Sequence, residues 1–518
     1  MSKSTQSTLL PRRAQKNLAI VGEQIRLARL RRDISIAQIA DRAGCSELTV
    51  MRVEKGTPSV AIGTYLRILF ALNLDEDILL IAQQDTIGRE LQDLSLKKRQ
   101  RATSKQKTMQ EIEVYLDHNA QLELVGKLTY EQLRGNATYH FAYDAAWLTR
   151  HPHLALSGDL QSHTGWQHTT KRLFGCFTDA LPDRWGRRLI DKREQIVAQA
   201  ENRIPRTFSD FDYLLQLDDY SRMGAFRFRI VGEKEFIGTS GEMSVPPLTS
   251  LRDFTQIAQA YEAKPDNIQW VTNLLRQGSS LGGARPKANM MDENGELYIA
   301  KVPSIHDDYD VALWEHFAHQ LAKKAGIQVA ETKLMAISGF SHHVLLSKRF
   351  DRVEDKRVHT VSAMTLTNLQ DGADASSGNG YLDIVDTIVS GMGIADADKN
   401  LRELYRRVAF SICIGNHDDH FRNHAFILTQ NGWTLSPAYD INPTNMTTQS
   451  LLISDCSCDS SLVELQRASG HYLLSKEVAS QIIQEVKDAV CDWRKVATQC
   501  HIAPAEQQRF AKRLELCL

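Results

Sequence analysis

Three polar side chains in the last quarter of the sequence have the types and spacing needed for phosphoryl transfer. Asp418 and Asn423 are separated by four residues, and Asp440 follows Asn423 by 17 residues. A carboxylate can orient and deprotonate a substrate hydroxyl, while a carboxamide and a second carboxylate supply the hard oxygen ligands that Mg²⁺ prefers. This spacing occurs in loops that transfer the γ-phosphoryl group of ATP. We therefore predict Asp418 as the general base and Asn423 and Asp440 as Mg²⁺ ligands in one cleft.

Two other interpretations of this segment remain open. His417, His420 and His424 lie close to Asp418 in the sequence and could bind a transition metal with it. The H-E-x-x-H spacing typical of helical zinc sites is absent, which disfavours that site. The segment could also be an ordinary polar loop.

Upstream, residues 278–287 have the composition of a phosphate-binding loop. They contain three glycines and two serines, so their backbone amides could wrap phosphate groups. The segment lacks the G-K-[ST] ending of a Walker A loop, and a flexible surface loop is the alternative. Lys301 follows in an alternating strand pattern that lets its side chain project into a cleft, although a strand lysine is usually just solvated. Glu315, in a predicted helix 14 residues further on, either pairs with Lys301 or is exposed.

The composition is that of a globular protein with more than one domain. The chain has 518 residues, 42% of them hydrophobic and 24% charged, and exceeds the usual size of a single core. No apolar stretch approaches the roughly 20 residues needed to cross a bilayer, and the first residues lack the apolar core of a secretory signal. The eight cysteines include only a lone C-x-C, Cys456 and Cys458, which favours reduced thiols over a metal site. We expect a cytoplasmic protein without membrane contact.

Changes in pattern along the chain predict the order of its domains. Residues 1–95 have mainly helical spacing, 96–110 form a basic linker, and strands and helices mix in 111–250. Residues 251–518 add a second strand-rich stretch and a mainly helical end. Residues 1–107 contain 19 Lys+Arg against 11 Asp+Glu, a charge of +8, so the remaining 411 residues carry −9. A basic first domain suits a polyanionic partner, and an acidic body does not.

The first domain contains the signals of a helix-turn-helix. Ser35 and Gln38 form a predicted capping box, Gly44 supplies a left-handed turn, and Ser46 caps a second helix. The segment ISIAQIADRAGCSELTVMRVEKG resembles the Cro/repressor-type helix-turn-helix family, whose second helix enters the major groove of DNA. Glu54 is expected to be structural, and a helical hairpin used only for protein contact is the alternative. By position, the side chains expected to face DNA are Ser46, Glu47, Thr49 and Arg52.

Motifs in the rest of the chain resemble those of the HipA kinase family. NHDDHFRNHAF and SPAYDINP are similar to its catalytic and metal-binding segments, SSLGGARPK to its phosphate loop, YIAKVP to its nucleotide-lysine strand and SKRFDR to its adenine-proximal segment. The resemblance implies the same three roles for Asp418, Asn423 and Asp440, and places Lys301 on the ATP phosphates. It implies an ATP site that also includes Ser280, Gly282, Gly283, Glu315, Ser347, Lys348 and Phe350.

Ser280 matches the serine that this family autophosphorylates, and Ser279 is the neighbouring alternative. A phosphate on this loop would repel the nucleotide, so we expect it to switch the kinase off. Residues 112–235, which include LVGKLTY, FAYDAAWL and LPDRWGR, resemble the amino-terminal subdomain of HipA proteins. Their aromatic side chains and Pro182 are expected to pack rather than to take part in chemistry.

The predicted fold is therefore multidomain. It combines an all-α helix-turn-helix domain with an α+β, protein-kinase-like bilobed HipA fold whose C-lobe is mainly helical. The resemblance implies an ATP- and Mg²⁺-dependent serine/threonine kinase that binds its own operator DNA, forms a homodimer through the DNA-binding domain and phosphorylates a translation-related protein, with an aminoacyl-tRNA synthetase as one candidate. In the best-known members the DNA-binding antitoxin is a separate chain. The alternatives are a transcription regulator with a kinase-like sensor body that lacks transferase activity, and a small-molecule phosphotransferase.

Overall fold

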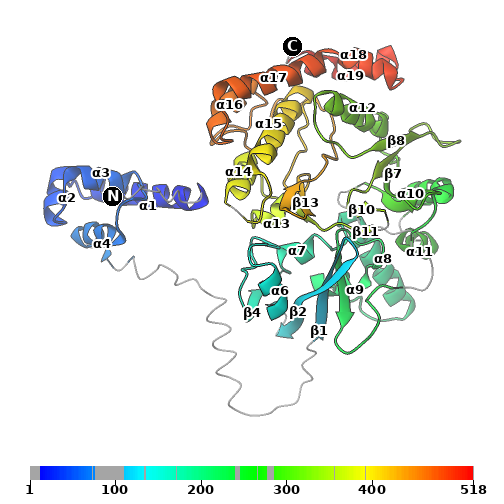
Figure 1. The fold of residues 1–518 in the computed structure, drawn as a ribbon, viewed down its shortest axis with the longest axis horizontal. Coiled ribbons are helices and arrows are strands. Elements are labelled where there is room, and N and C mark those ends of the chain that lie inside the picture. The colour runs from blue at the N-terminus through cyan, green and yellow to red at the C-terminus, as the bar shows by residue number, and fades with distance from the viewer. Residues whose placement is uncertain are drawn as a thin grey trace, which may run out of the picture. The chain divides into compact units, whose positions relative to one another are not determined.

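The computed structural model divides the chain into two compact units, Met1–Lys105 and Gln106–Leu518 (Figure 1). Within these units it describes residues 12–72, 74, 75, 77, 110–133, 136–170, 172–239, 245–264, 267–276, 285–354, 356–390 and 392–516. In these ranges no helix is long and apolar enough to cross a membrane.

The first unit has the predicted helix-turn-helix. Ser35 and Gln38 form the capping box at the start of α2, and the Ser46 hydroxyl accepts a hydrogen bond from the backbone N–H of Thr49 at the start of α3 (3.2 Å). Between these helices Gly44 has a φ of +59°, the left-handed turn that a glycine adopts without strain. Apolar side chains from all the described helices form the core of the unit, among them Ile25, Ile39, Val50, Val53 and Ile68. The helices are α1 (Arg12–Leu30), α2 (Ile36–Arg42), α3 (Glu47–Glu54) and α4 (Ile62–Ala71).

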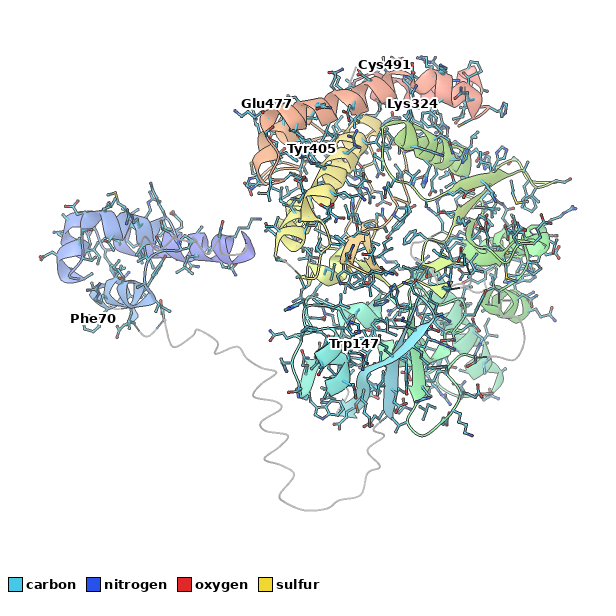
Figure 2. All side chains as sticks on the ribbon, viewed as in Figure 1. Phe70, Trp147, Lys324, Tyr405, Glu477 and Cys491 are labelled. Carbon is cyan, nitrogen blue, oxygen red and sulfur yellow. The ribbon has the colours of Figure 1, made fainter. Side chains whose placement is uncertain are left out.

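The second unit begins with a five-stranded antiparallel sheet of order β4-β3-β2-β1-β5. Its strands are β1 (Gln110–His118), β2 (Gln121–Leu133), β3 (Asn136–Tyr143), β4 (Trp166–Thr170) and β5 (Phe226–Ile230). Helices from the same part of the chain accompany it: α6 (Ala145–Arg150), α7 (Gly175–Thr178), α8 (Arg184–Ala200) and α9 (Asp210–Gln216). Aromatic side chains such as Phe141, Trp147 and Phe177 are buried here, as the sequence predicts (Figure 2 labels Trp147).

A second antiparallel sheet of the same unit has the order β6-β7-β9-β8. Its strands are β6 (Lys287–Met291), β7 (Leu297–Lys301), β8 (Thr332–Met335) and β9 (Val344–Lys348). Helices α10 (Leu251–Ala263) and α11 (Ile268–Arg276), together with α8, pack in one core with the sheet residues Ala288, Met290, Tyr298, Ala300 and Leu346. Because side chains alternate along a strand, the neighbouring residues Lys287, Lys301 and Ser347 lie on the other face.

The rest of the unit is mainly helical. Helix α15 (Ala397–Ile414) is buried along most of its length, and Tyr405 at its centre is fully buried (Figure 2). Around it are α14 (Tyr381–Val389), α17 (Lys476–Cys491) and α19 (Pro504–Glu515), and α12 (Val311–Lys324) packs against α17. Shorter helices are α13 (Ala363–Leu366), α16 (Leu462–Arg467) and α18 (Trp493–Gln499), and the strands are β10 (Arg352–Val353), β11 (Lys356–Arg357), β12 (Thr360–Ser362), β13 (Ala425–Thr429) and β14 (Gly432–Leu435). The predicted fold class is confirmed.

Candidate active site and helix-turn-helix surface

A lysine and two carboxylates from three separate elements meet at one point of the second unit. Lys301 is the last residue of β7, Glu315 lies on α12, and Asp440 follows β14. The Lys301 ammonium is 2.6 Å from Glu315 Oε1 and 2.6 Å from Asp440 Oδ1. The Glu315 side chain is only 5% exposed. Of the two possibilities that the sequence left open for Glu315, the structure therefore shows the ion pair.

In this cluster, burial and the neighbouring opposite charges shift the pKa of each group in opposite directions. Burial alone would lower the pKa of Lys301, but Asp440 and Glu315 raise that pKa above its ordinary value. Burial would likewise raise the pKa of Asp440, but the ammonium groups of Lys301 and Lys287 hold it well below its usual range. The pKa of Glu315 is raised, because burial outweighs the effect of Lys301. Lys301 and Asp440 are therefore charged at neutral pH.

The predicted catalytic segment turns sharply after α15. Gly415 ends the helix in the left-handed region (φ +68°), where a Cβ atom would meet Thr444 O at 2.5 Å. Asp418 is exposed, while Asn423 is 8% exposed and donates from Nδ2 to the backbone carbonyl of Asp418 (3.3 Å). The hydrogen bond fixes Asn423 against the residue that carries the exposed carboxylate.

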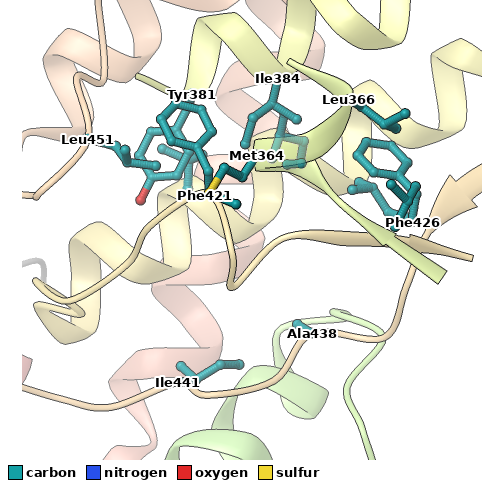
Figure 3. Close-up of a cluster of buried hydrophobic side chains, with 14 of the residues drawn as sticks. Met364, Leu366, Tyr381, Ile384, Phe421, Phe426, Ala438, Ile441 and Leu451 are labelled. Atoms are coloured by element: carbon teal, nitrogen blue, oxygen red, sulfur yellow. The ribbon is translucent and has the colours of Figure 1, made fainter. Parts of the chain in front are cut away.

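The neighbouring carboxylate, Asp419, points the other way and anchors the segment. It accepts hydrogen bonds from the Tyr381 hydroxyl (2.7 Å) and from His424 Nε2 (3.2 Å to Oδ2), and it is 4% exposed. Burial would raise the pKa of Asp419, but His424 and the Tyr381 hydroxyl hold it below the ordinary value. Phe421 in the same segment lies among the apolar side chains that surround Tyr381 and Met364 (Figure 3). Sequence reasoning missed this anchor, although two adjacent aspartates in a turn signal that only one of them can face outward.

Asp440 has a left-handed backbone (φ +57°), an uncommon conformation for a residue other than glycine. Asn442 donates to its Oδ1 (3.3 Å), and Asn442 Oδ1 is buried without a hydrogen-bond partner among the described residues. Just before Asp440, the ring of Tyr439 packs against Phe350, with 5.6 Å between centroids. Phe350, predicted to lie near adenine, is therefore adjacent in space to the segment that carries Asp440.

The other predicted ATP-site residues do not all lie on the Lys301 face of the sheet. Ser347 shares the Lys301 face of the sheet, as its pairing with Ile299 shows. The Lys348 side chain lies on the opposite face, where it forms an ion pair with Glu296. Ser279, Ser280, Gly282 and Gly283 lie outside the described residues.

The histidines of the catalytic segment face different partners. His417 Nδ1 is 2.8 Å from the Thr448 carbonyl, while His424 faces Asp419. In the described ranges, no three His, Cys, Asp or Glu side chains are grouped as a metal site would require. Cys456 and Cys458 are both free thiols.

On the first unit, the outer face of α3 carries most of the residues predicted to face DNA. Ser46, Glu47 and Arg52 are exposed. Thr49 is half-buried, and its hydroxyl lies 2.8 Å from that of Ser46, so these two hydroxyls engage each other at the helix start. Two apolar side chains, Leu48 and Met51, are also exposed on this helix, and no sequence pattern predicted them.

Glu54 at the end of α3 is structural, as predicted. Its Oε1 is 2.6 Å from Arg29 Nε, and both side chains are less than one-tenth exposed. The pKa of Arg29 is raised chiefly by its hydrogen bond to Glu54. This buried pair ties α3 to α1.

Comparison with known proteins agrees with this architecture. Family models match as "HipA N-terminal domain" over residues 113–225, "HipA-like C-terminal domain" over 279–493 and "Helix-turn-helix domain" over 20–79. The second unit thus has the kinase-like fold of HipA proteins. The chain as a whole carries both HipA domains together with an amino-terminal helix-turn-helix domain.

Individual known proteins match at 30% sequence identity or less. A Haemophilus influenzae protein named "Putative kinase" is 30% identical over 183 residues, which are 32% of this chain and 52% of that protein. "Putative kinase Y4dM" of Sinorhizobium fredii is 30% identical over 159 residues, 28% of this chain and 37% of its own. The chain therefore spans about half or less of these curated relatives. A solved complex of Shewanella oneidensis HipA, HipB and operator DNA contains a chain with the same fold, at a TM-score of 0.55 and 16% identity, covering 79% of this chain and 96% of that one.

Proposed function

We propose that this protein is an ATP-dependent serine/threonine protein kinase of the HipA type. The observation that carries the proposal is the contact of Lys301 with both Glu315 and Asp440, at 2.6 Å each. A lysine held by a helical glutamate and adjacent to a metal-binding aspartate is the arrangement that protein kinases need for transfer. The exposed Asp418 supplies the base for the acceptor.

The chemistry assigns one task to each side chain. Lys301 binds the ATP phosphates, with Glu315 fixing its direction. The acceptor hydroxyl loses its proton to Asp418 as its oxygen bonds to the γ-phosphorus, and the bond from that phosphorus to the β-phosphate oxygen breaks. Transfer then depends on positioning and charge neutralisation.

The residues around Asp440 fit a magnesium ion. Asp440 offers a carboxylate, Asn423 an amide oxygen, and Asn442 Oδ1 is a buried oxygen without a hydrogen-bond partner among the described residues. Mg²⁺ prefers hard oxygen ligands of this kind, and when bound it neutralises charge on the phosphates. Asp440 and Asn423 would hold the ion.

Incubation of the protein with labelled ATP and a cell lysate tests this function. We expect the label in protein, on serine or threonine, and no labelling with the Asp418→Asn variant. Label in a small molecule instead would identify a metabolite phosphotransferase. Absence of transfer by intact, ATP-binding protein would favour a sensor body attached to a transcription regulator.

Regulation through Ser280 forms part of the proposal and rests on the sequence alone. A phosphate of charge about −1.5 to −2 on a loop that wraps nucleotide phosphates repels the nucleotide, so modification switches the kinase off. Mass spectrometry of protein expressed in active form should find phosphate on Ser280, and Asp418→Asn protein should lack it. Phosphate on Ser279 alone would move the switch by one residue, and an unmodified loop in active protein would remove it. The same phosphopeptide analysis of whole cells would identify the protein substrate, for which a translation protein such as an aminoacyl-tRNA synthetase is our candidate.

The second proposed activity is binding of operator DNA by the first unit. It is supported by the exposed Arg52 and Glu47 on α3 and by the charge of +8 on residues 1–107. Helices of this kind place such side chains on base edges in the major groove, and two-fold symmetric operators require a dimer. Mobility-shift assays of the full chain on the DNA upstream of its own gene test the proposal, and a complex containing two chains is expected. No retardation at low salt would refute it.

A further inference from the structure

A second lysine, Lys287, lies beside Lys301 at one end of the sheet. Lys287 is the first residue of β6 and pairs in register with Lys301 of β7, so both side chains leave the same face of the sheet. Only 6% of the Lys287 side chain is exposed. Electrostatically it acts on the same groups as Lys301, namely Asp440 and Glu315. Two ammonium groups therefore occupy the end of the sheet that faces the candidate active site.

The nearest carboxylate to Lys287 comes from the amino-terminal subdomain. Asp183 Oδ2 lies 3.9 Å from Lys287 Nζ, and the Asp183 side chain is 2% exposed. Asp183 Oδ1 accepts a hydrogen bond from the backbone N–H of Gly186 at 2.5 Å and so caps α8. Oδ2 has no hydrogen-bond partner among the described residues. One oxygen thus holds the helix and the other faces the lysine.

The helix that carries Asp183 is rigidly placed. Trp185 and Leu189 of α8 are buried in the same core as Ala288 and Ala300 of the sheet. A residue at the first turn of α8 therefore keeps a fixed position relative to β6 and β7. The segment LPDRWGR contributes packing through Trp185, as the sequence predicts, and also brings a buried carboxylate to the active-site end of the sheet.

Burial disfavours the charged form of both members of the pair, and each partner offsets part of that effect. Burial lowers the pKa of Lys287, and Asp183 opposes this effect. Burial raises the pKa of Asp183 to about 7, with Lys287 acting in the opposite direction. Removing one partner from a buried pair leaves an uncompensated charge, which is costly, whereas removing both is often tolerated. A lysine that lost this carboxylate would lose its proton or change its position.

We infer that Asp183 is a positioning residue of the nucleotide site, which holds the Lys287 ammonium beside Lys301 so that two cations face the ATP phosphates. The inference rests on the proposed kinase function and deepens it, because it gives the amino-terminal subdomain a part in nucleotide binding. Asp183 itself does not touch the nucleotide. It acts through Lys287.

A double-mutant cycle on the full-length chain tests this inference. The variants are Asp183→Asn, Lys287→Met and the double variant, and the measurement is calorimetric affinity for Mg²⁺ with a non-hydrolysable ATP analogue. Asparagine caps helices about as well as aspartate, so α8 should stay intact. The matched control is Asp144→Asn, since Asp144 caps α6 in the same subdomain and forms no ion pair among the described residues.

We expect Asp183→Asn and Lys287→Met each to weaken binding by at least roughly tenfold, because a buried charge that loses its partner is strongly disfavoured. The double variant should bind no more weakly than Lys287→Met, because Asp183 acts only through that lysine. A purely structural role of Asp183 would instead give additive losses of affinity in the double variant, and that result would overturn the inference. An affinity of Asp183→Asn within twofold of the wild type, or above it, would also overturn the inference. Asp144→Asn should match the wild type, and an equal loss there would also overturn it. If the wild type itself does not bind the analogue, the proposed kinase function fails first and this inference with it.

Discussion

Replacing Glu315 by glutamine removes one charge from the cluster around Lys301 and changes almost nothing else. Glutamine has the same shape, and its oxygen can still accept a hydrogen bond from the lysine. Lys301 would keep its 2.6 Å contact with Asp440, so the ammonium should be drawn toward that aspartate. The lysine is then displaced from the phosphates while Asp440 is neutralised more strongly.

The expected magnitude follows from the burial of the pair. Glu315 is 5% exposed and Lys301 is 18% exposed, so water screens their interaction little. A hydrogen bond to a charged group contributes about 1.5–3 kcal/mol, and the lower end applies because the neutral acceptor remains. A loss of about 1.5–2 kcal/mol corresponds to a fall of roughly 10- to 30-fold in kcat/KM for ATP.

The assay is the initial rate of labelled phosphate incorporation into the protein itself at varied ATP concentration. Glu296→Gln is the matched control, because Glu296 also pairs with a lysine of this sheet, Lys348, but on the face away from Lys301. We expect that control to stay within twofold of the wild type. Equal rates for Glu315→Gln and the wild type would refute the view that this ion pair orients the nucleotide lysine.

Three further perturbations have defined outcomes. Asp418→Asn should lower the transfer rate ~10²–10⁴-fold while leaving affinity for an ATP analogue unchanged, and activity within a few-fold of the wild type would remove Asp418 as the base. Thr49→Ala combined with Arg52→Ala should bring promoter binding, measured by fluorescence anisotropy, close to the level for unrelated DNA, since each base contact contributes ~1–3 kcal/mol. Burial lowers the pKa of His319 to about 4 from 6.5, so the unfolded state takes up the proton first as the pH falls. The contribution of His319 to the free energy of unfolding is therefore fully present above about pH 6.5 and falls by about 3 kcal/mol by pH 4. The free energy of unfolding of His319→Gln, measured with urea, should depend less on pH over that interval.

Features encoded within a few residues could be predicted from the sequence. The capping box of Ser35 and the left-handed Gly44 depend on local backbone geometry, which the residue types specify directly. The spacing of Asp418 and Asn423 likewise fits within one turn of chain, and the structure joins them by a hydrogen bond. The structural role expected for Glu54 agrees with its buried ion pair with Arg29.

Features that depend on how distant elements meet could not be predicted in this way. Strand alternation shows that Ser347 and Lys348 lie on opposite faces, but only the pairing of β9 with β7 decides which one shares the face of Lys301. Glu315 on its helix was compatible with either solvent or the lysine until α12 was placed. Asp183 is more than 100 residues from Lys287 in the sequence, so no local pattern links them.

The covalent union of a helix-turn-helix unit with a kinase-like unit limits how the proposed kinase can be controlled. A separate antitoxin chain can be degraded to release its kinase, whereas a fused unit stays attached in a fixed ratio. The two parts also differ in charge, with +8 on residues 1–107 and −9 on the remainder, so DNA attracts the first part and repels the second. Such repulsion is screened over about 8 Å at physiological salt and cannot by itself regulate a buried catalytic cluster. The proposed control at the active site, through a phosphate placed on Ser280, would act directly on the nucleotide and would need no separation of the two units.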